Sequence, residues 1–342
     1  MTEIIFQSFL MEDAMQPKFS SKWSKIAKFT GIPLLLLVGV PTILFAWVVS
    51  HRPDLAREIL KTPPASATTL EQILARPRPI QLETLNTGIV ALDKTVLLNP
   101  DHPEFKNFTE DGSDLLVYAH LIRHPEQGEF LVDSGLDASF KNSTTGNVDG
   151  PGRLWMSVAG ITFLQKEGQD IKSQLKHRAA NPRAVYFTHL HLDHTTGLPE
   201  LPTDLDLITG PGEGSDPFYW DSGHLDRFEK LHELDFSNAI NLDPLGPAVD
   251  VFGDGSFWAI QTPGHTDGHL SFLVNSDRGA TLLTGDAIHF RWGFQHGVGG
   301  VGGNSERNAR AQASADAIIA FAERYPKVTI FFGHQPPIEG KK

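Results

Sequence analysis

Residues 184–194 read Ala-Val-Tyr-Phe-Thr-His-Leu-His-Leu-Asp-His, which joins an apolar run to a cluster of histidine and aspartate side chains. The first five residues are apolar or β-branched, as is typical of a buried strand. The strand therefore delivers the cluster to its own end. In an extended backbone, side chains at positions i and i+2 point to the same side, so His189 and His191 can reach one ion together.

The crowding of ionisable groups in this cluster predicts a metal site. A turn beginning near Asp193 would carry Asp193 and His194 towards a position beside the first pair. Three imidazoles and a carboxylate this close would repel on protonation unless a metal ion held the imidazoles neutral. We interpret the histidines outside the motifs as surface or hydrogen-bonded residues: His102, His120, His124, His177, His224, His232 and His296.

Three later segments each end an apolar strand in a short turn with one ligand-type residue: Thr262-Pro-Gly-His265, Thr284-Gly-Asp286 and Phe332-Gly-His334. The glycine beside each of these residues allows a sharp turn, which places the side chain at a sheet edge instead of in the core. Each turn is common by itself. Their joint occurrence after the histidine cluster predicts one site built from four segments.

This order of motifs resembles the metallo-β-lactamase superfamily, specifically its dinuclear hydrolase branch, from about residue 85 to 340. The resemblance implies an α/β fold, the four-layer αββα sandwich, with one catalytic domain. It implies that a first metal ion is bound by His189, His191 and His265, a second by Asp193, His194 and His334, and that Asp286 bridges them. Asp133, in Asp133-Ser-Gly, resembles a family turn that supports the site from behind.

The ligand types favour particular metals. Five histidines and two carboxylates fit zinc best, and manganese, iron or cobalt also suit nitrogen and oxygen ligands. The chain contains no cysteine, which excludes thiolate metal sites, disulfides and a cysteine nucleophile. We therefore expect two divalent ions per chain. Two ions that share a carboxylate would also share a water, lower its pKa and provide hydroxide near neutral pH.

Asp286 narrows the substrate class, because true β-lactamases of the superfamily usually lack the bridging aspartate. The segment from His189 to Pro199, with Gly285-Asp-Ala-Ile-His289 later, is similar to the N-acyl homoserine lactonase and organophosphorus hydrolase group. We therefore expect hydrolysis of an ester-type bond in a small molecule, with a lactone as first choice. The alternatives are a phosphotriester or phosphodiester hydrolase, a glyoxalase-II-like thioesterase, and a diiron redox protein on the same fold.

Two residues are candidates for catalytic roles, Asp193 and His289. Many lactonases of this group carry a tyrosine three residues after the bridging aspartate, where this chain has His289. A histidine there can protonate a leaving alkoxide or hydrogen-bond the carbonyl; the alternative is structural support of a ligand. Aromatic residues near the same edge suit either an apolar pocket or core packing: Phe218, Tyr219, Trp220, Phe290, Trp292 and Phe294.

The N-terminal region differs in composition from the rest. Four lysines between residues 18 and 28 precede an uncharged stretch over 29–51. At ~1.5 Å per residue, such a stretch reaches about the ~30 Å of a bilayer core. We predict a basic segment over 1–28, a transmembrane helix over 29–51 and a linker over 52–80. The alternatives are a cleaved signal peptide and a buried helix.

The remaining chain, 81–342, is predicted to be the catalytic domain, placed by the positive-inside bias on the non-cytoplasmic side of the membrane. The net charge of −12, with no basic run beyond the N-terminal region, argues against nucleic acid as a partner. The oligomeric state stays open. Strands are expected over 115–123, 130–135, 184–188, 256–262, 270–274, 280–284 and 328–332, helices over 170–178 and 305–325 with Ser305 as the cap, and loops over 136–160 and 293–303.

Overall fold

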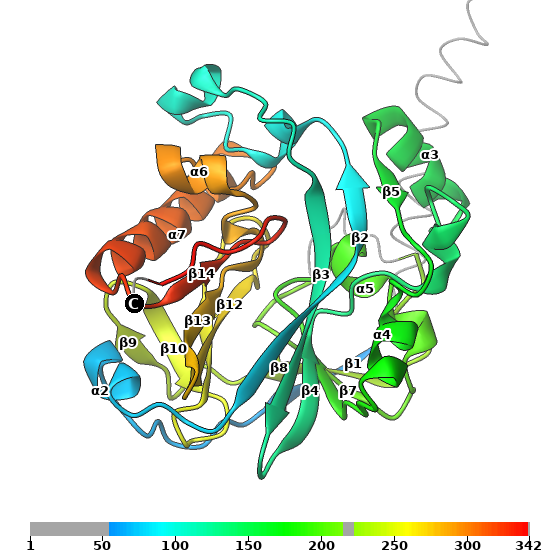
Figure 1. The fold of residues 1–342 in the computed structure, drawn as a ribbon. Helices are drawn as coiled ribbons and strands as arrows, with labels where there is room; N and C mark the ends of the chain where they lie inside the picture. The colour runs from blue at the N-terminus through cyan, green and yellow to red at the C-terminus, as the bar shows by residue number, and fades with distance from the viewer. Residues whose placement is uncertain (1–54, 215–221, 341–342) are drawn as a thin grey trace, which may run out of the picture. The chain divides into compact units, whose positions relative to one another are not determined.

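Two β-sheets form the centre of the protein (Figure 1). The computed structural model describes residues 55–214 and 222–340. The larger sheet has the strand order β1 (Ala56–Leu60), β8 (Lys230–Leu234), β7 (Asp206–Thr209), β6 (Ala184–Tyr186), β4 (Gly128–Val132), β3 (Leu115–His124), β2 (Gln81–Ala91) and β5 (Thr162–Leu164). The smaller sheet has the order β14 (Thr329–Phe331), β13 (Gly279–Leu283), β12 (Leu270–Ser276), β11 (Phe257–Gln261), β10 (Gly246–Asp250) and β9 (Ile240–Leu242).

Helices cover the outer faces of both sheets. The helices of the described residues are α2 (Leu70–Leu74), α3 (Gly150–Ala159), α4 (Ile171–His177), α5 (Leu192–Thr195), α6 (Arg291–His296) and α7 (Ser305–Arg324). Ile171 and Leu175 of α4 pack against the outer face of the larger sheet. Ile318 and Phe321 of α7 pack with α2 on the outer face of the smaller sheet. The layers therefore run helix, sheet, sheet, helix, and the α/β part of the predicted fold is confirmed.

Aromatic side chains fill the space between the sheets. Phe130 and Tyr186 come from the larger sheet, and Phe257 and Phe272 from the smaller one. The rings of Phe130 and Phe257 lie 5.1 Å apart, and those of Tyr186 and Phe257 lie 5.4 Å apart. This contact accounts for the many phenylalanines of the sequence, because a broad apolar interior between two sheets needs large side chains.

The topology brings the polar turns to one edge. In the larger sheet, β4, β6 and β7 are parallel neighbours, so their carboxyl ends lie together. In the smaller sheet, β13 is parallel to β14, and β11 and β13 each pair antiparallel with β12. The carboxyl ends of β11, β13 and β14 therefore also share one edge. The motif residues follow directly after these strands, which is why they meet.

The prediction of a transmembrane helix is corrected. Over residues 55–214 and 222–340, none of the helices has the length and apolar character needed to cross a bilayer. The stretch 29–51, to which the prediction applied, and the basic segment 1–28 lie outside the described residues. The fold class is therefore corrected to the α/β sandwich alone. The membrane partner and the non-cytoplasmic location rested on that helix and are withdrawn with it.

Several segments differ from the elements expected. Strands β1, β2, β5 and β7 to β10 lie outside the predicted strands, and α6 lies partly within the predicted loop over 293–303. Within 52–80, strand β1 pairs in parallel with β8 and helix α2 packs on the smaller sheet, so we propose that the folded domain begins no later than β1. Within 136–160, α3 forms with Asp149 as its N-cap and Met156 buried. Helix α7 spans Ser305–Arg324, but its N-cap is Asn304 instead of Ser305, because the Asn304 side chain accepts a hydrogen bond from the backbone N–H of Arg307.

Candidate metal centre

Three histidines from both sheets form a first cluster. His189 and His191 follow β6, and His265 follows β11. Their ligand-type nitrogen atoms all lie within 4.8 Å of one another. The distance between His265 Nε2 and His191 Nδ1 is 2.9 Å. His189 and His265 are buried whereas His191 is exposed, so the cluster reaches the surface at His191.

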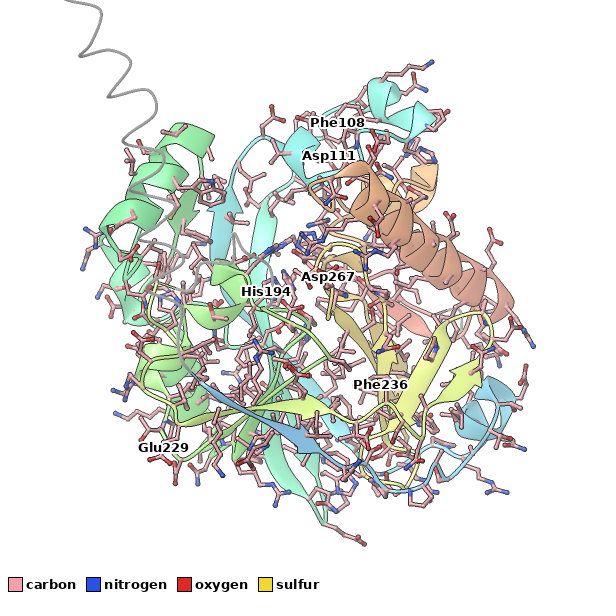
Figure 2. All side chains as sticks on the ribbon, turned by 180° about the vertical axis from the view of Figure 1, so that it is seen from behind. Phe108, Asp111, His194, Glu229, Phe236 and Asp267 are labelled. Atoms are coloured by element: carbon pink, nitrogen blue, oxygen red, sulfur yellow. The ribbon has the colours of Figure 1, made fainter. Side chains whose placement is uncertain are left out.

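A second cluster lies beside the first. It combines Asp193 and His194, on the short helix α5, with Asp286 after β13 and His334 after β14. His334 Nε2 lies 3.3 Å from Asp193 Oδ2, and His194 Nε2 lies 3.5 Å from the same oxygen. Figure 2 shows His194 within the body of the molecule. Every residue that the sequence assigned to the second ion is thus brought together.

Asp286 lies between the two clusters. Its Oδ2 atom is 3.6 Å from His265 Nε2 and 3.7 Å from His189 Nε2, on the side of the first cluster. The same oxygen is 3.3 Å from His334 Nε2 and 3.7 Å from His194 Nε2, on the side of the second. A carboxylate in this position can reach an ion in either cluster.

Hydrogen bonds to the far nitrogen of three histidines fix the direction of their rings. His194 Nδ1 donates to Asp133 Oδ2 over 2.8 Å, His265 Nδ1 to the carbonyl of Val301 over 2.9 Å, and His334 Nδ1 to the carbonyl of Leu116 over 2.9 Å. Each bond leaves Nε2 facing the other ligand-type groups. Such bonds set the tautomer and orientation of metal-binding histidines.

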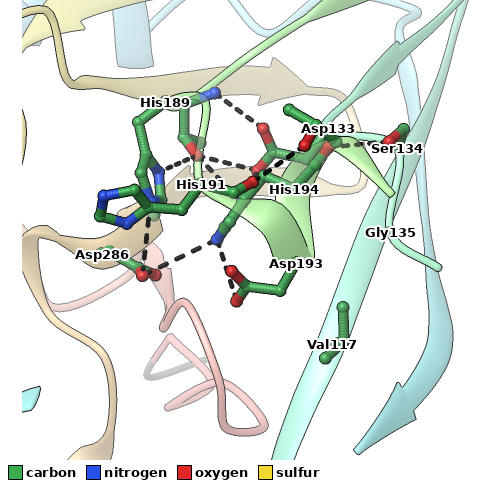
Figure 3. Close-up of polar contacts among 12 residues, drawn as sticks. Val117, Asp133, Ser134, Gly135, His189, His191, Asp193, His194 and Asp286 are labelled. Carbon is green, nitrogen blue, oxygen red and sulfur yellow. Dashed lines mark hydrogen bonds and ion pairs between the residues drawn. The ribbon is translucent and has the colours of Figure 1, made fainter. Parts of the chain in front are cut away.

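Asp133 supports the second cluster from behind, as the resemblance implied (Figure 3). Its Oδ1 accepts a hydrogen bond from the backbone N–H of Thr188, and its Oδ2 accepts one from the Thr188 hydroxyl. The backbone of Asp133 has φ 59°, a left-handed conformation that is unfavourable for a residue other than glycine. Strain of this kind persists where the surrounding contacts require it, and here those contacts orient His194.

Glycine at position 333 allows the last strand to approach the central carboxylate. A Cβ atom added to Gly333 would lie 2.2 Å from Asp286 Oδ1, which is well inside van der Waals contact. The glycine of Phe332-Gly-His334 is therefore needed because its backbone packs directly against the carboxylate of Asp286. Any larger residue would displace either Asp286 or His334.

The pKa values divide the histidines by cluster. Burial and the neighbouring imidazoles lower the pKa of His189 and of His265 well below the ordinary value, so both rings are neutral. Burial alone would also lower the pKa of His334, but the charges of Asp286 and Asp193 outweigh it and raise this pKa to about 9. Asp133 and Asp193 likewise outweigh burial and raise the pKa of His194 well above its ordinary value.

The residues fit bound metal ions. Among the described residues, several buried polar atoms at the centre have no hydrogen-bond partner: His189 Nε2, His194 Nε2, Asp286 Oδ1, His289 Nδ1 and His289 Nε2. Unpaired buried polar atoms are costly, and so many in one place are expected where the side chains serve as metal ligands. The donor set is nitrogen and carboxylate oxygen, which suits divalent ions of the zinc type.

His289 also lies at this centre. It is 2% exposed, and its Nε2 is 3.3 Å from Asp286 Oδ2. Its ligand-type atom groups with those of His265 and Asp286 within 4.8 Å. Of the neighbouring aromatic residues, Phe290 and Trp292 pack in one apolar cluster and Phe294 in another. Phe218, Tyr219 and Trp220 lie outside the described residues.

Sequence reasoning missed two buried residues beside the clusters. His269 accepts a hydrogen bond at Nε2 from the backbone N–H of Asp286, and its Nδ1 lies 2.8 Å from the Thr262 hydroxyl. Glu213 contacts the loops that carry His189 and His265. A signal existed for Glu213, because Gly210-Pro-Gly-Glu213 follows β7 just as the other motifs follow their strands.

Comparisons with known proteins agree with this arrangement. A family model described as the metallo-beta-lactamase superfamily matches residues 112–334. The metallo-hydrolase mfmC of Annulohypoxylon moriforme is 27% identical over 234 residues, which is 62% of this chain and 58% of that protein. This chain therefore spans less than two thirds of the length of that relative.

Two further similarities concern lactonases. The N-acyl homoserine lactonase AttM of Agrobacterium fabrum is 27% identical over 227 residues, 63% of this chain and 80% of that protein. A crystal structure of a mutant AiiA of B. thuringiensis, with N-decanoyl-L-homoserine bound at its active site, has a TM-score of 0.57 at 21% identity. It covers 75% of this chain and 94% of that one. At this identity the structural similarity concerns the fold alone.

Proposed function

Because the chain belongs to the metallo-beta-lactamase superfamily, whose model matches residues 112–334, we propose that it opens lactones with the help of two bound metal ions. The coarser statement holds independently of the substrate: the chain is a metallo-hydrolase. The proposed substrate is a small-molecule lactone of the N-acyl homoserine type. The name of the relative AttM supports this choice.

One observation carries the proposal, namely the central position of Asp286. Its Oδ2 lies within 3.7 Å of imidazole nitrogens from both clusters. A carboxylate that faced only one cluster would fit a single ion. We therefore assign the first ion to His189, His191 and His265, the second to Asp193, His194 and His334, and Asp286 to both.

The bound ions would supply Lewis acidity towards the lactone carbonyl and a hydroxide nucleophile near neutral pH, as zinc does in other hydrolases. Zinc is the proposed metal, and manganese, iron or cobalt suit the same nitrogen and oxygen donors. The protein holds the donors in place beforehand. His194, His265 and His334 are each oriented by a hydrogen bond at Nδ1, so little reorganisation is needed.

Proton transfer is assigned to Asp193 and His289. In the reaction, water adds to the carbonyl carbon, the ring bond from that carbon to oxygen breaks, and the ring oxygen takes up a proton. Asp193 is the proposed acceptor of the proton of the attacking water. His289 is the proposed donor to the leaving oxygen, because both of its ring nitrogens are buried without a hydrogen bond among the described residues and its Nε2 lies 3.3 Å from Asp286 Oδ2, between the clusters.

A substrate panel tests the reaction class. The purified full chain, loaded with zinc, is assayed with an N-acyl homoserine lactone, a thioester, a p-nitrophenyl phosphodiester and a paraoxon-type phosphotriester. We expect the lactone to have the highest kcat/KM, and we expect its hydrolysis to stop on treatment with a chelator. A higher kcat/KM for a phosphoester or the thioester would contradict the lactone assignment. In the chain as purified, before zinc is added, iron absorption in the visible range without hydrolysis of any ester would identify a redox protein instead.

The substitution Asp286→Asn tests the shared carboxylate. It preserves shape but removes the charge that lies between the clusters, so fewer than two ions should stay bound. We expect kcat/KM to fall by more than the ~10- to 100-fold typical of residues behind metal ligands. Asp277→Asn, in the exposed turn between β12 and β13, is the matched control and should match the wild type. Unchanged activity of Asp286→Asn would rule out the bridged site.

A further inference from the structure

A buried carboxylate lies beside the first cluster but is not part of any set of ligand-type side chains, among the described residues, that could hold a metal ion. Glu213 stands in the turn after β7 and is 2% exposed. A buried carboxylate needs hydrogen-bond donors to offset the loss of water. The identity of these donors indicates the role of Glu213.

One oxygen holds the loop after β6. Oε1 of Glu213 accepts a hydrogen bond of 3.0 Å from the backbone N–H of Leu190. Leu190 stands between His189 and His191, and its side chain is buried against the larger sheet. The bond therefore fixes the peptide that joins two proposed ligands of the first ion.

The other oxygen holds the loop after β11. Oε2 accepts a hydrogen bond of 2.6 Å from the Thr266 hydroxyl and one of 3.2 Å from the backbone N–H of Gly268. Thr266 directly follows His265, the third proposed ligand. A Cβ atom at Gly268 would lie 2.5 Å from the backbone nitrogen of Glu213, so the two turns are in backbone contact.

We propose that Glu213 is a positioning residue of the first metal site, which it assembles by tying the His189–His191 loop of one sheet to the His265 loop of the other. This inference rests on the proposed division of ligands between two ions. The residue is not itself a ligand. It acts by holding three imidazoles at a separation that one ion can span.

The second site has a corresponding carboxylate. Asp133 accepts hydrogen bonds from Thr188 and from His194, which is a proposed ligand of the second ion only. The two carboxylates come from the turns after β4 and β7, which lie on either side of β6 in the larger sheet. The Thr188 hydroxyl that donates to Asp133 also lies 3.1 Å from His189 Nδ1, so Asp133 contacts the second cluster directly and the first through Thr188. Loss of Asp133 should therefore weaken the second site more than the first, whereas loss of Glu213 should weaken the first site and spare the second.

The experiment measures metal binding instead of turnover. The full chain is stripped of metal and titrated with zinc against a chromophoric chelator, which resolves the two binding steps. The variants His265→Ala and His334→Ala mark the step that belongs to each cluster. Glu213→Gln keeps the size of the side chain but replaces one accepting oxygen with an amide NH₂ group. This group would face the hydrogen-bond donors of either the loop after β6 or the loop after β11, so the bonds to that loop are lost.

We expect Glu213→Gln to weaken the step marked by His265→Ala by about 10- to 100-fold and to leave the other step unchanged. Asp133→Asn should weaken the step marked by His334→Ala most, with a smaller loss at the other step because Thr188 links Asp133 to His189. Thr266→Val removes one of the three hydrogen bonds and should weaken the same step as Glu213→Gln by less. In the Glu213→Gln background, Thr266→Val should cause little further loss of affinity, because both substitutions disrupt the same contact between Glu213 and Thr266.

Three results would overturn the proposal. The first is an equal loss of affinity at both steps in Glu213→Gln. The second is unchanged affinity in Glu213→Gln and Thr266→Val, with only a lower melting temperature, which would make the role of Glu213 purely structural. The third is a loss confined to the step marked by His334→Ala. A wild-type chain that binds a single ion would instead contradict the two-metal assignment, and the titration reports this outcome separately.

Discussion

His289 is the residue at which the proposed proton transfer can be tested most directly. Its imidazole lies beside Asp286 and has no other polar partner among the described residues. If it protonates the leaving oxygen, His289→Phe should lower kcat on the lactone by ~10²-fold or more, the usual contribution of a general acid. Zinc content should stay at the wild-type value, because the proposed ligand sets do not include His289.

His289→Tyr provides the matched comparison. A phenol can donate a proton, so this variant should retain more activity than His289→Phe, with the alkaline limb of the rate profile displaced. The measurement is kcat against pH for all three proteins. Equal kcat in the wild type and His289→Phe would exclude the proton-donor role. A loss of zinc in both variants would indicate that His289 binds the metal.

At the scale of the residue, the sequence predicted which ligand-type side chains the structure brings together, for a physical reason. His189, His191 and His194 are close in the chain, and each later ligand-type residue stands in a glycine turn after an apolar strand. Glu213 and His269 were missed because their role depends on contacts between loops far apart in sequence. A single glutamate or histidine in a turn gives no indication of which loop it will meet.

At the scale of the element, the sequence predicted seven strands, which correspond to β3, β4, β6 and β11 to β14, but it did not predict the other strands of the two sheets or the start of α3. The runs over 115–122 and 184–188 are mostly apolar, as expected for strands between two layers. Helix α3 was missed because Gly150, Pro151 and Gly152 are poor helix formers. Its formation depends on the Asp149 cap and on the burial of Met156, which are tertiary effects.

The contribution of the N-cap of α7 to the free energy of unfolding can be measured. The Asn304 side chain accepts a hydrogen bond of 3.0 Å from the backbone N–H of Arg307, whereas Ser305 is exposed in the first turn. Asn304→Ala should therefore lower the free energy of unfolding by about 1 kcal/mol. Ser305→Ala should change it by less than about 0.5 kcal/mol. Urea unfolding measures the free energy of unfolding of both variants. A larger loss of stability in Ser305→Ala than in Asn304→Ala would show that Ser305 is the N-cap, as the sequence predicted.

At the scale of the whole molecule, buried neutral histidines should make stability depend on pH. Burial lowers the pKa of His120 to about 3, that of His269 to about 3 and that of His224 to about 4. In the unfolded chain each would titrate near ~6.5. Below that pH the unfolded chain binds protons that the folded protein does not, so stability is lost as the pH falls from about 6.5.

The substitution His120→Phe removes one of these histidines and so measures its contribution to the pH dependence of stability. Between about pH 6.5 and pH 5, the slope of unfolding free energy against pH should fall by up to ~1.4 kcal/mol per pH unit relative to the wild type. Thr84→Val is the control, because it removes the hydrogen bond to His120 Nδ1 but leaves the ring titratable. It should lower stability without changing the slope. An unchanged slope in His120→Phe would show that this ring is protonated in the folded state.

The order of the proposed ligands along the chain determines which of the two clusters can be completed first during synthesis. The first cluster is complete in sequence at His265, but the second waits for His334, which follows the last strand, β14. On the ribosome, the two sites therefore become available at different times. Contacts between distant segments also form slowly, because a long loop must close first. Under the proposed assignment, an ion that binds before His334 is synthesised would occupy the first cluster while the smaller sheet is still unfinished.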